Sequence, residues 1–336
     1  MPLLEVNDLH TSFFTDAGEV KAVNGVSFNL ERGKVLGIVG ESGSGKSVTA
    51  YSIMQILAGT GKIVGGSIKL DGQELVNAGE NVMKTVRGNK VSIIFQDPMT
   101  SLNPTYTIGH QLMEAIVLHT NRNKAQAKER AIEMLRLVNI NEPEKRMNQY
   151  PFEFSGGMRQ RIMIAMALAC EPDILIADEP TTALDVTIQA QILELMKSLQ
   201  EELGMAIIMI THDLGVVAQL CDEVIVMYAG SICEQGTADE IFYNPCHEYT
   251  KGLIRSIPSA TSAGTRLQPI TGTPIDLLNM PKGCPFAPRC DAAMKICLRE
   301  RCQRMIINED HAASCWMNVK RGVENGTITL TEGGNA

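Results

Sequence analysis

Several features that would place this 336-residue chain in another class of protein are missing from it. No apolar run approaches the roughly 18–20 residues that a helix needs to cross a bilayer. The first residues, Met1–Phe14, include Glu5 and Asp8 and neither Lys nor Arg, so the basic start and long apolar stretch of a secretory signal are absent. We therefore expect a cytoplasmic protein that reaches a membrane only through partners.

An excess of basic side chains is missing as well. The chain carries 30 basic and 38 acidic side chains, a net charge of −8, which argues against a general nucleic-acid binder. No internal repeat is visible, so a single unit of the fold is encoded. The nine cysteines show no pairs of C-x₂-C type, and in a reducing cytosol structural disulfides are not expected.

What the chain does contain is an alternation of short apolar runs and helical patterns, which predicts an α/β fold with a largely parallel sheet. The expected core strands are Lys34–Gly40, Val91–Phe95, Ile174–Ala177, Ala206–Ile210 and Glu223–Met227. The expected helices are Val48–Leu57 and, in an insertion between the halves of the sheet, Ile108–His119, Lys124–Val138 and Met158–Ala169. A linker is expected near Ile257–Pro274, and Pro281–Trp316 is expected to form a separate small unit.

The most specific motif is Gly40–Ser47, GESGSGKS, which lies between an expected strand and an expected helix. It matches the phosphate-binding pattern G-x-x-x-x-G-K-[ST]. Glycines let the backbone curl so that its N–H groups point at phosphate oxygens beside a helix N-terminus. Lys46 is expected to reach the β- and γ-phosphates, and Ser47 to bind Mg²⁺. The residues expected to hold the nucleotide are Ser42, Gly43, Ser44, Gly45, Lys46, Ser47 and Val48.

Two carboxylates end the apolar strand Ile174–Glu179, ILIADE. Asp178 is expected to hold Mg²⁺ of a bound nucleotide, and Glu179 to polarise a water aimed at the γ-phosphate. Alone, the pattern would fit a strand followed by an acidic turn equally well. The phosphate loop upstream favours the catalytic interpretation.

Further short motifs resemble those of ABC ATPases and follow that family's order over about Leu3–Leu253. Phe154–Gln160, FSGGMRQ, is similar to the signature LSGGQ, with Met158 where Gln is common. The other matching motifs are Gln96 in the Q-loop, Thr182–Asp185 (TALD) in the D-loop and His212 as the switch histidine.

This resemblance implies that two ATPases pack head to tail around ATP. Ser155, Gly156 and Gly157 would open a helix and offer an anion site to the nucleotide of the other subunit. Gln96 would contact Mg²⁺ and the attacking water and link them to the helical insertion, while His212 would contact the γ-phosphate. Asp185 belongs to the expected nucleotide-binding set. Phe13, favoured over Phe14, would stack on adenine, although a core or edge aromatic fits that position nearly as well.

The resemblance also implies a P-loop NTPase fold: a RecA-like core with an antiparallel β subdomain, a helical subdomain and a small cysteine-rich C-terminal extension. The expected divisions are residues 1–97 (core with the phosphate loop), 98–170 (helical signature subdomain), 171–256 (second part of the core) and 257–336 (linker and extension).

Longer strings are similar to the ATPases of oligopeptide and dipeptide importers, and to the first of the two paired types. They are Phe95–Pro104, Phe154–Ala169, Ala177–Leu193, Met227–Gly236 and Asn244–Pro258, with Glu248 where Pro is typical. The implied assembly contains a second homologous ATPase, two permeases and an extracytoplasmic substrate-binding protein, with this chain at the cytoplasmic face of the membrane. Peptides are the expected cargo, and nickel or another small solute is the alternative.

Four cysteines crowd into the C-terminal region with five, six and seventeen residues between them: Cys284, Cys290, Cys297 and Cys315. Clustered thiols suggest a metal, and four cysteines suit an iron–sulfur cluster. GCPFAPRC, Gly283–Cys290, resembles the extension of peptide-importer ATPases, which implies a [4Fe–4S] cluster on these four residues. Cys302 falls outside the pattern. Reduced thiols without metal remain the alternative.

Two other functions stay open at this point. One is a non-transport ABC ATPase of DNA repair or translation, which would typically show fused units or long coiled coils. The other is a redox sensor in which the cluster controls an inert nucleotide domain. The presence of both Glu179 and His212 favours real ATP hydrolysis.

Overall fold

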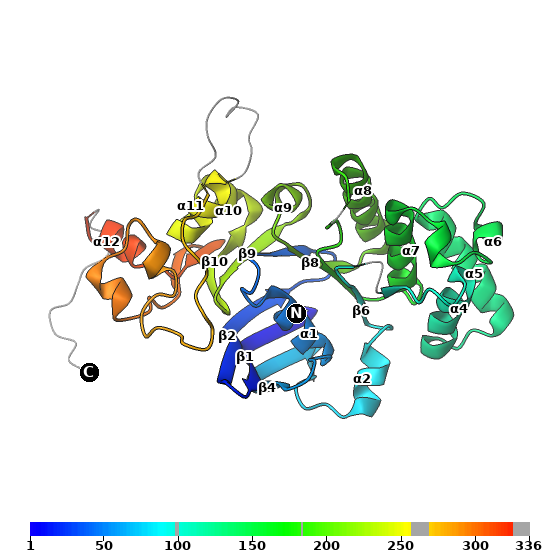
Figure 1. The fold of residues 1–336 in the computed structure, drawn as a ribbon, viewed down its shortest axis with the longest axis horizontal. Coiled ribbons are helices and arrows are strands. Elements are labelled where there is room, and N and C mark those ends of the chain that lie inside the picture. The colour runs from blue at the N-terminus through cyan, green and yellow to red at the C-terminus, as the bar shows by residue number, and fades with distance from the viewer. Residues whose placement is uncertain (98–100, 183, 257–268, 325–336) are drawn as a thin grey trace.

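The computed structural model describes residues 1–97, 101–182, 184–256 and 269–324. Pro98–Thr100, Ala183 of the D-loop and most of the expected linker, 257–268, lie outside the described residues. Figure 1 shows a molecule drawn out along one axis, with the helical insertion at one end and the C-terminal region at the other. Among the described residues, none of the helices combines the length and apolar character required to cross a membrane.

The central sheet has eight strands in the order β11-β12-β10-β9-β3-β8-β7-β6. Its parallel part comprises β6 (Val91–Ile94), β7 (Ile174–Asp178), β8 (Ala206–Thr211), β3 (Val35–Val39) and β9 (Glu223–Tyr228). Its antiparallel edge comprises β10 (Ser231–Thr237), β12 (His311–Ala313) and β11 (Met305–Asn308). The five strands expected from sequence all form, with ends that differ by one residue at most.

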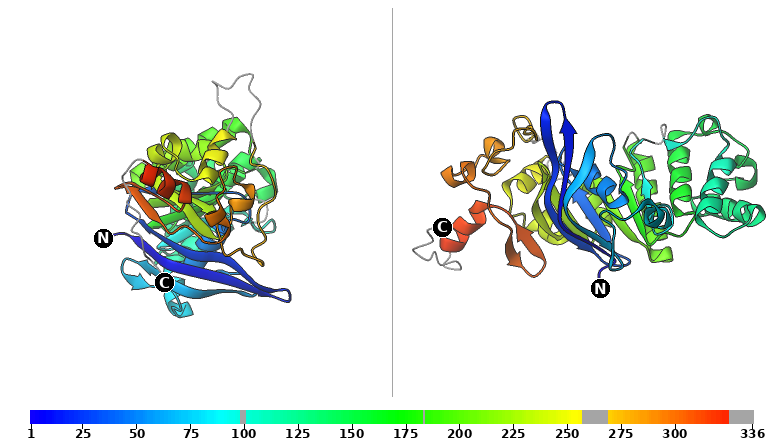
Figure 2. Two further views of the ribbon diagram at one scale, coloured as in Figure 1. Left: turned by 90° about the vertical axis from the view of Figure 1, so that its left-hand side faces the viewer. Right: turned by 90° about the horizontal axis from the view of Figure 1, so that it is seen from below.

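A second, antiparallel sheet of four strands has the order β2-β1-β4-β5. Its strands are β1 (Leu4–Thr15), β2 (Gly18–Leu30), β4 (Gly61–Leu70) and β5 (Gln73–Glu74). Figure 2 shows it lying across the middle of the molecule, beside the central sheet. Together with the central sheet it confirms the expected P-loop NTPase core with an antiparallel β subdomain.

Successive side chains on the central strands point to opposite faces of the sheet, and this divides the interior into two cores. On β3, Leu36 and Ile38 face the core shared with the antiparallel sheet, while Val35 and Val39 face the core under the long helices. Both faces are therefore apolar, as expected for buried parallel strands.

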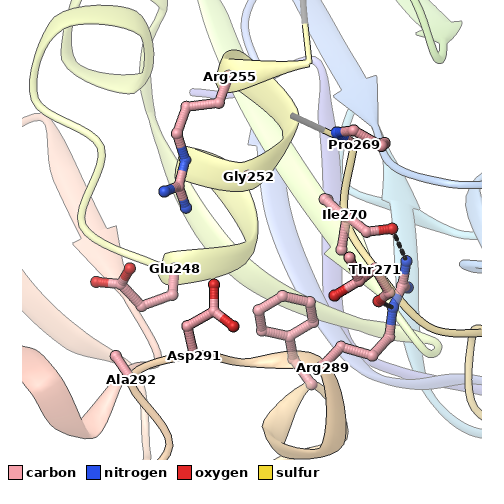
Figure 3. Close-up of a pocket in the computed structure, with 10 residues that line it drawn as sticks. Glu248, Gly252, Arg255, Pro269, Ile270, Thr271, Arg289, Asp291 and Ala292 are labelled. Atoms are coloured by element: carbon pink, nitrogen blue, oxygen red, sulfur yellow. Dashed lines mark hydrogen bonds between the residues drawn. The ribbon is translucent and has the colours of Figure 1, made fainter. Parts of the chain in front are cut away.

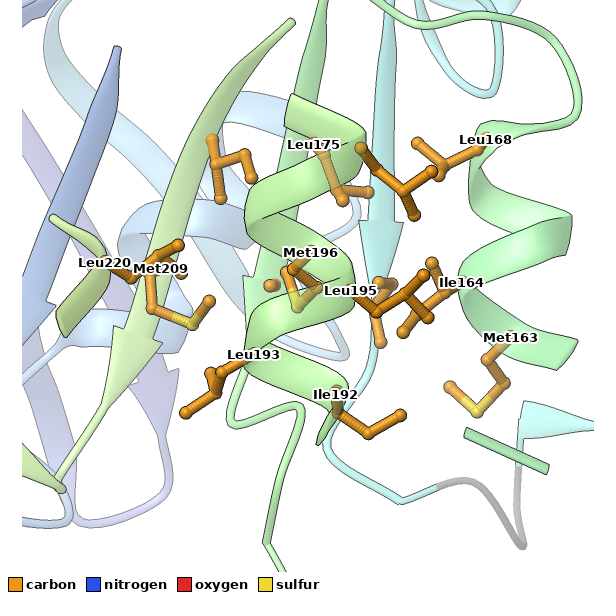
Figure 4. Packing of buried hydrophobic residues seen from close by; sticks show 14 of the residues in the cluster. Met163, Ile164, Leu168, Leu175, Ile192, Leu193, Leu195, Met196, Met209 and Leu220 are labelled. Carbon is orange, nitrogen blue, oxygen red and sulfur yellow. The ribbon is translucent and has the colours of Figure 1, made fainter. Parts of the chain in front are cut away.

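The helices flank these sheets. They are α1 (Lys46–Met54), α2 (Glu80–Val86), α4 (Ile108–His119), α5 (Lys124–Leu137), α6 (Pro143–Arg146), α7 (Gly156–Leu168), α8 (Val186–Leu203), α9 (Leu214–Leu220), α10 (Ala238–Tyr243), α11 (Glu248–Arg255) and α12 (Trp316–Glu324). Figure 4 shows how α8 joins the helical insertion to the core: Leu195 points toward Ile164 of α7, and Leu193 points to the other side, toward Met209 and Leu220.

The expectation that Pro281–Trp316 forms a separate small unit is wrong. β12 pairs with β10, so the C-terminal hairpin continues the central sheet. The preceding segment also joins the main core, in which Phe286 is buried. The pairing covers an edge of β10 that would otherwise expose unpaired backbone groups.

Candidate functional site

The phosphate loop connects β3 to α1, and its backbone admits only glycine at critical points. Gly43 and Gly45 have φ of 76° and 102°, in the left-handed region. A Cβ on Gly45 would also lie 2.5 Å from the carbonyl oxygen of Ala22. The loop therefore needs glycine both for its torsions and for its close approach to the β subdomain.

Lys46 lies buried over this loop. Its ammonium donates to the carbonyl oxygens of Gly40 at 2.8 Å and Glu41 at 3.0 Å. Burial lowers the pKa of Lys46, opposed by the nearby carboxylates of Glu179, Asp178 and Glu41. The hydroxyl of Ser44 is buried and has no hydrogen-bond partner among the described residues. A donor left unpaired in this way fits a site for a polar ligand such as phosphate.

Asp178 ends β7 directly beside the start of α1. Its carboxylate accepts from the hydroxyl of Ser47 at 2.9 Å and from that of Tyr51 at 3.0 Å. Burial raises the pKa of Asp178, and burial together with the Asp178 charge raises that of Tyr51 to about 12. A carboxylate and a hydroxyl next to a phosphate loop are the oxygen ligands that Mg²⁺ takes with nucleotides, so these residues fit that ion.

Glu179 is the point on which three loops converge. Its carboxylate accepts from Gln96 Nε2 at 3.0 Å and Thr182 Oγ1 at 2.9 Å, and lies 3.2 Å from His212 Nδ1. The backbone holds the unusual φ of 48° at this residue, helped by the bond from its N–H to the carbonyl of Ile210 at 2.9 Å. Such left-handed torsions at non-glycine residues cluster at functional sites. A carboxylate held in this way can orient and polarise a water molecule.

The signature residues form a second, separate group at the start of α7. Ser155 caps the helix and accepts from the N–H of Met158 at 3.4 Å. Ser155 and Gly156 are exposed, and a Cβ on Gly157 would lie 2.7 Å from Ile188 of α8. Asp185, also exposed, caps α8 through the N–H of Ile188 at 2.9 Å. In Figure 1, α7 lies farther along the long axis than α1.

The adenine position stays a prediction. Phe13 is half-buried in β1, where its ring packs against Gly61 of β4 so closely that a Cβ there would lie 2.7 Å from it. Phe14 is 44% exposed. The packing of Phe13 fits the edge-aromatic alternative and leaves its role in nucleotide binding untested.

The four cysteines that crowd together in the C-terminal sequence also border a common cavity. Cys284, Cys290, Cys297 and Cys315 line one small cavity. Burial raises the pKa of Cys284 and Cys315, and that of Cys290 to about 11. Cys302 lines a second cavity with Cys284 and with Cys233 of β10, which gave no signal in the sequence. Four thiols around one cavity fit the donor set of an iron–sulfur cluster.

Sequence reasoning missed several residues around the phosphate loop. Tyr51 hydrogen-bonds to Asp178, and periodicity alone gave no reason to single it out. Thr182, expected only as part of the D-loop, also hydrogen-bonds to Glu179. Glu41 lies inside the recognised motif, but its partner Arg289 comes from the C-terminal region. Arg289 lies inside the recognised string Gly283–Cys290, but nothing in the sequence indicated that it pairs with Glu41.

Comparison with known protein families gives two matches along the chain. Residues 23–182 match the ABC transporter family, and residues 233–297 match the oligopeptide/dipeptide transporter C-terminal region.

Individual relatives cover nearly the whole chain. The oligopeptide transport ATP-binding protein OppD of Salmonella typhimurium is 56% identical over 88% of this chain and 88% of its own length. The dipeptide transport ATP-binding protein DppD of Bacillus subtilis is 53% identical over 95% of this chain and 96% of its own length.

A solved structure of a dimeric ATP-binding cassette in a post-hydrolysis state, bound to ADP and phosphate, has a TM-score of 0.63 at 26% identity. It covers 70% of this chain and 98% of the cassette.

Proposed function

Since this chain belongs to the ABC transporter family, and within it to the oligopeptide and dipeptide transport ATP-binding proteins, we propose that it hydrolyses ATP to drive peptide uptake through membrane-spanning partners. The observation that carries the proposal is the grouping of Ser47, Asp178 and Glu179 beside the phosphate loop, within a chain 56% identical to an oligopeptide transport ATP-binding protein.

We assign each residue a role in hydrolysis. The loop N–H groups and Lys46 hold the phosphates, and Ser47, Asp178 and Gln96 hold Mg²⁺ directly or through water. Bound there, the ion offsets phosphate charge. Glu179 takes the position of general base, and Gln96, Thr182 and His212 hold its carboxylate toward the γ-phosphate.

We propose that the nucleotide is enclosed by a second, homologous ATPase. Ser155 and Gly156 are exposed at a helix N-terminus, and the neighbouring Val186 is 82% exposed. An exposed anion site beside an exposed apolar side chain suits a surface that another subunit covers. The dimeric cassette structure supports the same arrangement.

Two permeases and an extracytoplasmic substrate-binding protein complete the proposed transporter, with this chain at the cytoplasmic face of the membrane. Support comes from relatives named as oligopeptide and dipeptide transport proteins, which also weakens a role in DNA repair or translation. We keep the division into residues 1–97, 98–170, 171–256 and 257–336 as the proposed organisation, with the last part joined to the core through the pairing of β12 with β10.

The test is to purify the chain with its genomic neighbours, reconstitute the complex in vesicles and measure ATP turnover with dipeptides, longer peptides or Ni²⁺. We expect peptides to stimulate turnover. Stimulation by Ni²⁺ and not by peptides would instead identify a nickel importer. Turnover that no cargo and no permease alters would contradict a transport role.

We propose further that Cys284, Cys290, Cys297 and Cys315 hold a [4Fe–4S] cluster. Their convergence on one cavity supports this, and such a cluster would tie the separate C-terminal loops together. Anaerobic purification should yield about four irons per chain with a broad visible absorption band. Cys297→Ser should lose both the iron and the absorption band. Cys170→Ser, which alters a buried cysteine outside the C-terminal region, should lose neither. If the full-length protein purified in this way contains no iron, the four cysteines are reduced thiols without a metal.

A further inference from the structure

The phosphate loop forms an ion pair with Arg289, a residue of the C-terminal region. Arg289 donates to both carboxylate oxygens of Glu41, at 2.5 and 2.9 Å, across 248 residues. The Arg289 side chain is 5% exposed and the Glu41 side chain 26%. A forked, largely buried pair of this kind fixes orientation far better than a surface ion pair does.

Every polar group of Glu41 is engaged. Its N–H donates to the hydroxyl of Tyr249 on α11 at 2.8 Å. Its carbonyl oxygen accepts from Lys46 Nζ at 3.0 Å and from the N–H of Ser44 at 3.2 Å. The C-terminal residues Arg289 and Tyr249 therefore hold the side chain and the N–H of the same residue whose carbonyl accepts from Lys46 and Ser44.

Arg289 is itself fixed from several sides. Its guanidinium donates to the carbonyl oxygens of Thr271 at 3.0 Å and Ile270 at 3.4 Å, and the latter bond is drawn in Figure 3. It also lies over the rings of Tyr228 and Phe286, at 5.9 and 6.0 Å. Arginine suits this position because a planar fork can pair and stack at once.

The segment that leads to Arg289 runs beside the loop as well. Pro274, Ile275 and Leu277 line a small cavity together with Glu41–Ser44. The related cassette structure covers only 70% of this chain, and the ABC transporter match ends at residue 182, whereas Arg289 falls within the C-terminal transporter region. The contact thus joins two parts of the chain that match different families.

We propose that Arg289 is a positioning residue for ATP binding: by clamping Glu41, the C-terminal extension holds the phosphate loop in its nucleotide-binding shape. The inference rests on the proposed nucleotide role of residues 42–48. In this proposal the C-terminal extension contributes to ATP binding and is not only attached to the ATPase core.

The test measures, on the full-length chain, the Kd for a fluorescent ATP analogue, the KM and kcat for ATP, and the melting temperature. Arg289→Met should weaken nucleotide binding and raise KM by about tenfold or more, because a partly buried carboxylate loses its partner. The kcat at saturating ATP should change much less. Arg289→Lys should restore part of the affinity, since it keeps the charge without the fork. Arg299→Met, at an exposed arginine in the same region, is the matched control.

Glu41→Gln is the second variant, because it preserves the side-chain shape if Arg289→Met folds poorly. It should raise Kd in the same direction, and the double variant Glu41→Gln/Arg289→Met should cost less than the sum of the two. A lower melting temperature with unchanged Kd and KM would overturn the proposal and leave Arg289 a purely structural residue.

Lys46→Ala separates the two proposals. Unimpaired nucleotide binding in Lys46→Ala would contradict the nucleotide site itself. Loss of binding in Lys46→Ala together with unchanged binding in Arg289→Met and Glu41→Gln would contradict the clamp alone.

Discussion

The two groups of residues expected to contact nucleotide differ in how complete they are within one chain. Around the phosphate loop, Ser47, Asp178, Glu179 and Gln96 already hydrogen-bond with one another or with close neighbours. At the start of α7, Ser155 and Gly156 are exposed, and the only hydrogen bond at the Ser155 hydroxyl among the described residues is its helix cap. The phosphate-loop group is already connected inside one chain, whereas the signature group is exposed and, in the proposed assembly, would meet nucleotide held by a second subunit.

This contrast predicts that the halves fail in different ways when they are altered. Damage to the phosphate-loop half should change hydrolysis or nucleotide affinity in the isolated chain. Damage to the signature half should leave the affinity of the isolated chain unchanged and act only in the assembled complex. The following variants test the contrast, beginning with the largest expected effect.

Glu179→Gln should lower ATP turnover of the assembled complex by about 100-fold or more while nucleotide affinity persists, because the amide keeps the shape but cannot act as a base. Turnover by phosphate release and affinity by fluorescence titration give the two readouts. Glu202→Gln, at an exposed position of α8, is the control. Turnover unchanged in Glu179→Gln would reject the assignment of this residue as general base.

Ser155→Asp should lower turnover of the complex by about tenfold or more, because a carboxylate keeps the helix cap yet repels a phosphate. The isolated chain should bind nucleotide as before. Ser155→Asn is the matched control, since it caps the helix without charge. Weaker nucleotide binding in the isolated Ser155→Asp chain would show that the two halves are not separate.

Phe13→Ala should weaken nucleotide binding by about tenfold if the ring stacks on adenine, and Phe14→Ala should have a smaller effect. Titrating both variants with ATP and with inorganic triphosphate separates base stacking from phosphate binding. Loss of stability with no selective loss for ATP would assign Phe13 to packing on Gly61 alone.

Asp185→Ala should remove the cap of α8 and lower the free energy of unfolding by about 1 kcal/mol, whereas Asp185→Asn should keep most of it. Urea unfolding of the isolated chain measures this. If Asp185→Asn is stable but lowers turnover of the complex, the charge of Asp185 acts across the interface between the two ATPase subunits. If Asp185→Asn and the unaltered complex show equal turnover, the role of Asp185 is limited to capping α8.

Much of the phosphate-loop half could be predicted because its signals are local. A strand, a glycine turn and a helix start lie in one stretch from Val35 to Met54, and ILIADE carries its own strand and carboxylates. The helix that carries the signature was predicted from apolar residues at helical spacing, and it begins at Gly156, two residues before the expected Met158.

The C-terminal region was harder because its partners are remote in sequence. Nothing in the residues 311–313 indicates pairing with β10, so the segment looked like a separate unit. The hydrogen bonds between strands carry no sequence signature of their own, and register depends on what lies beside the strand.

By itself, the amino-acid sequence was enough to predict a nucleotide site with a phosphate loop, a carboxylate for Mg²⁺ and a base at the end of a strand, because these motifs are short and local. Only the tertiary structure decided that the C-terminal hairpin continues the central sheet and that Arg289 pairs with Glu41. Such contacts depend on how separate elements pack, and packing is a property of the whole chain.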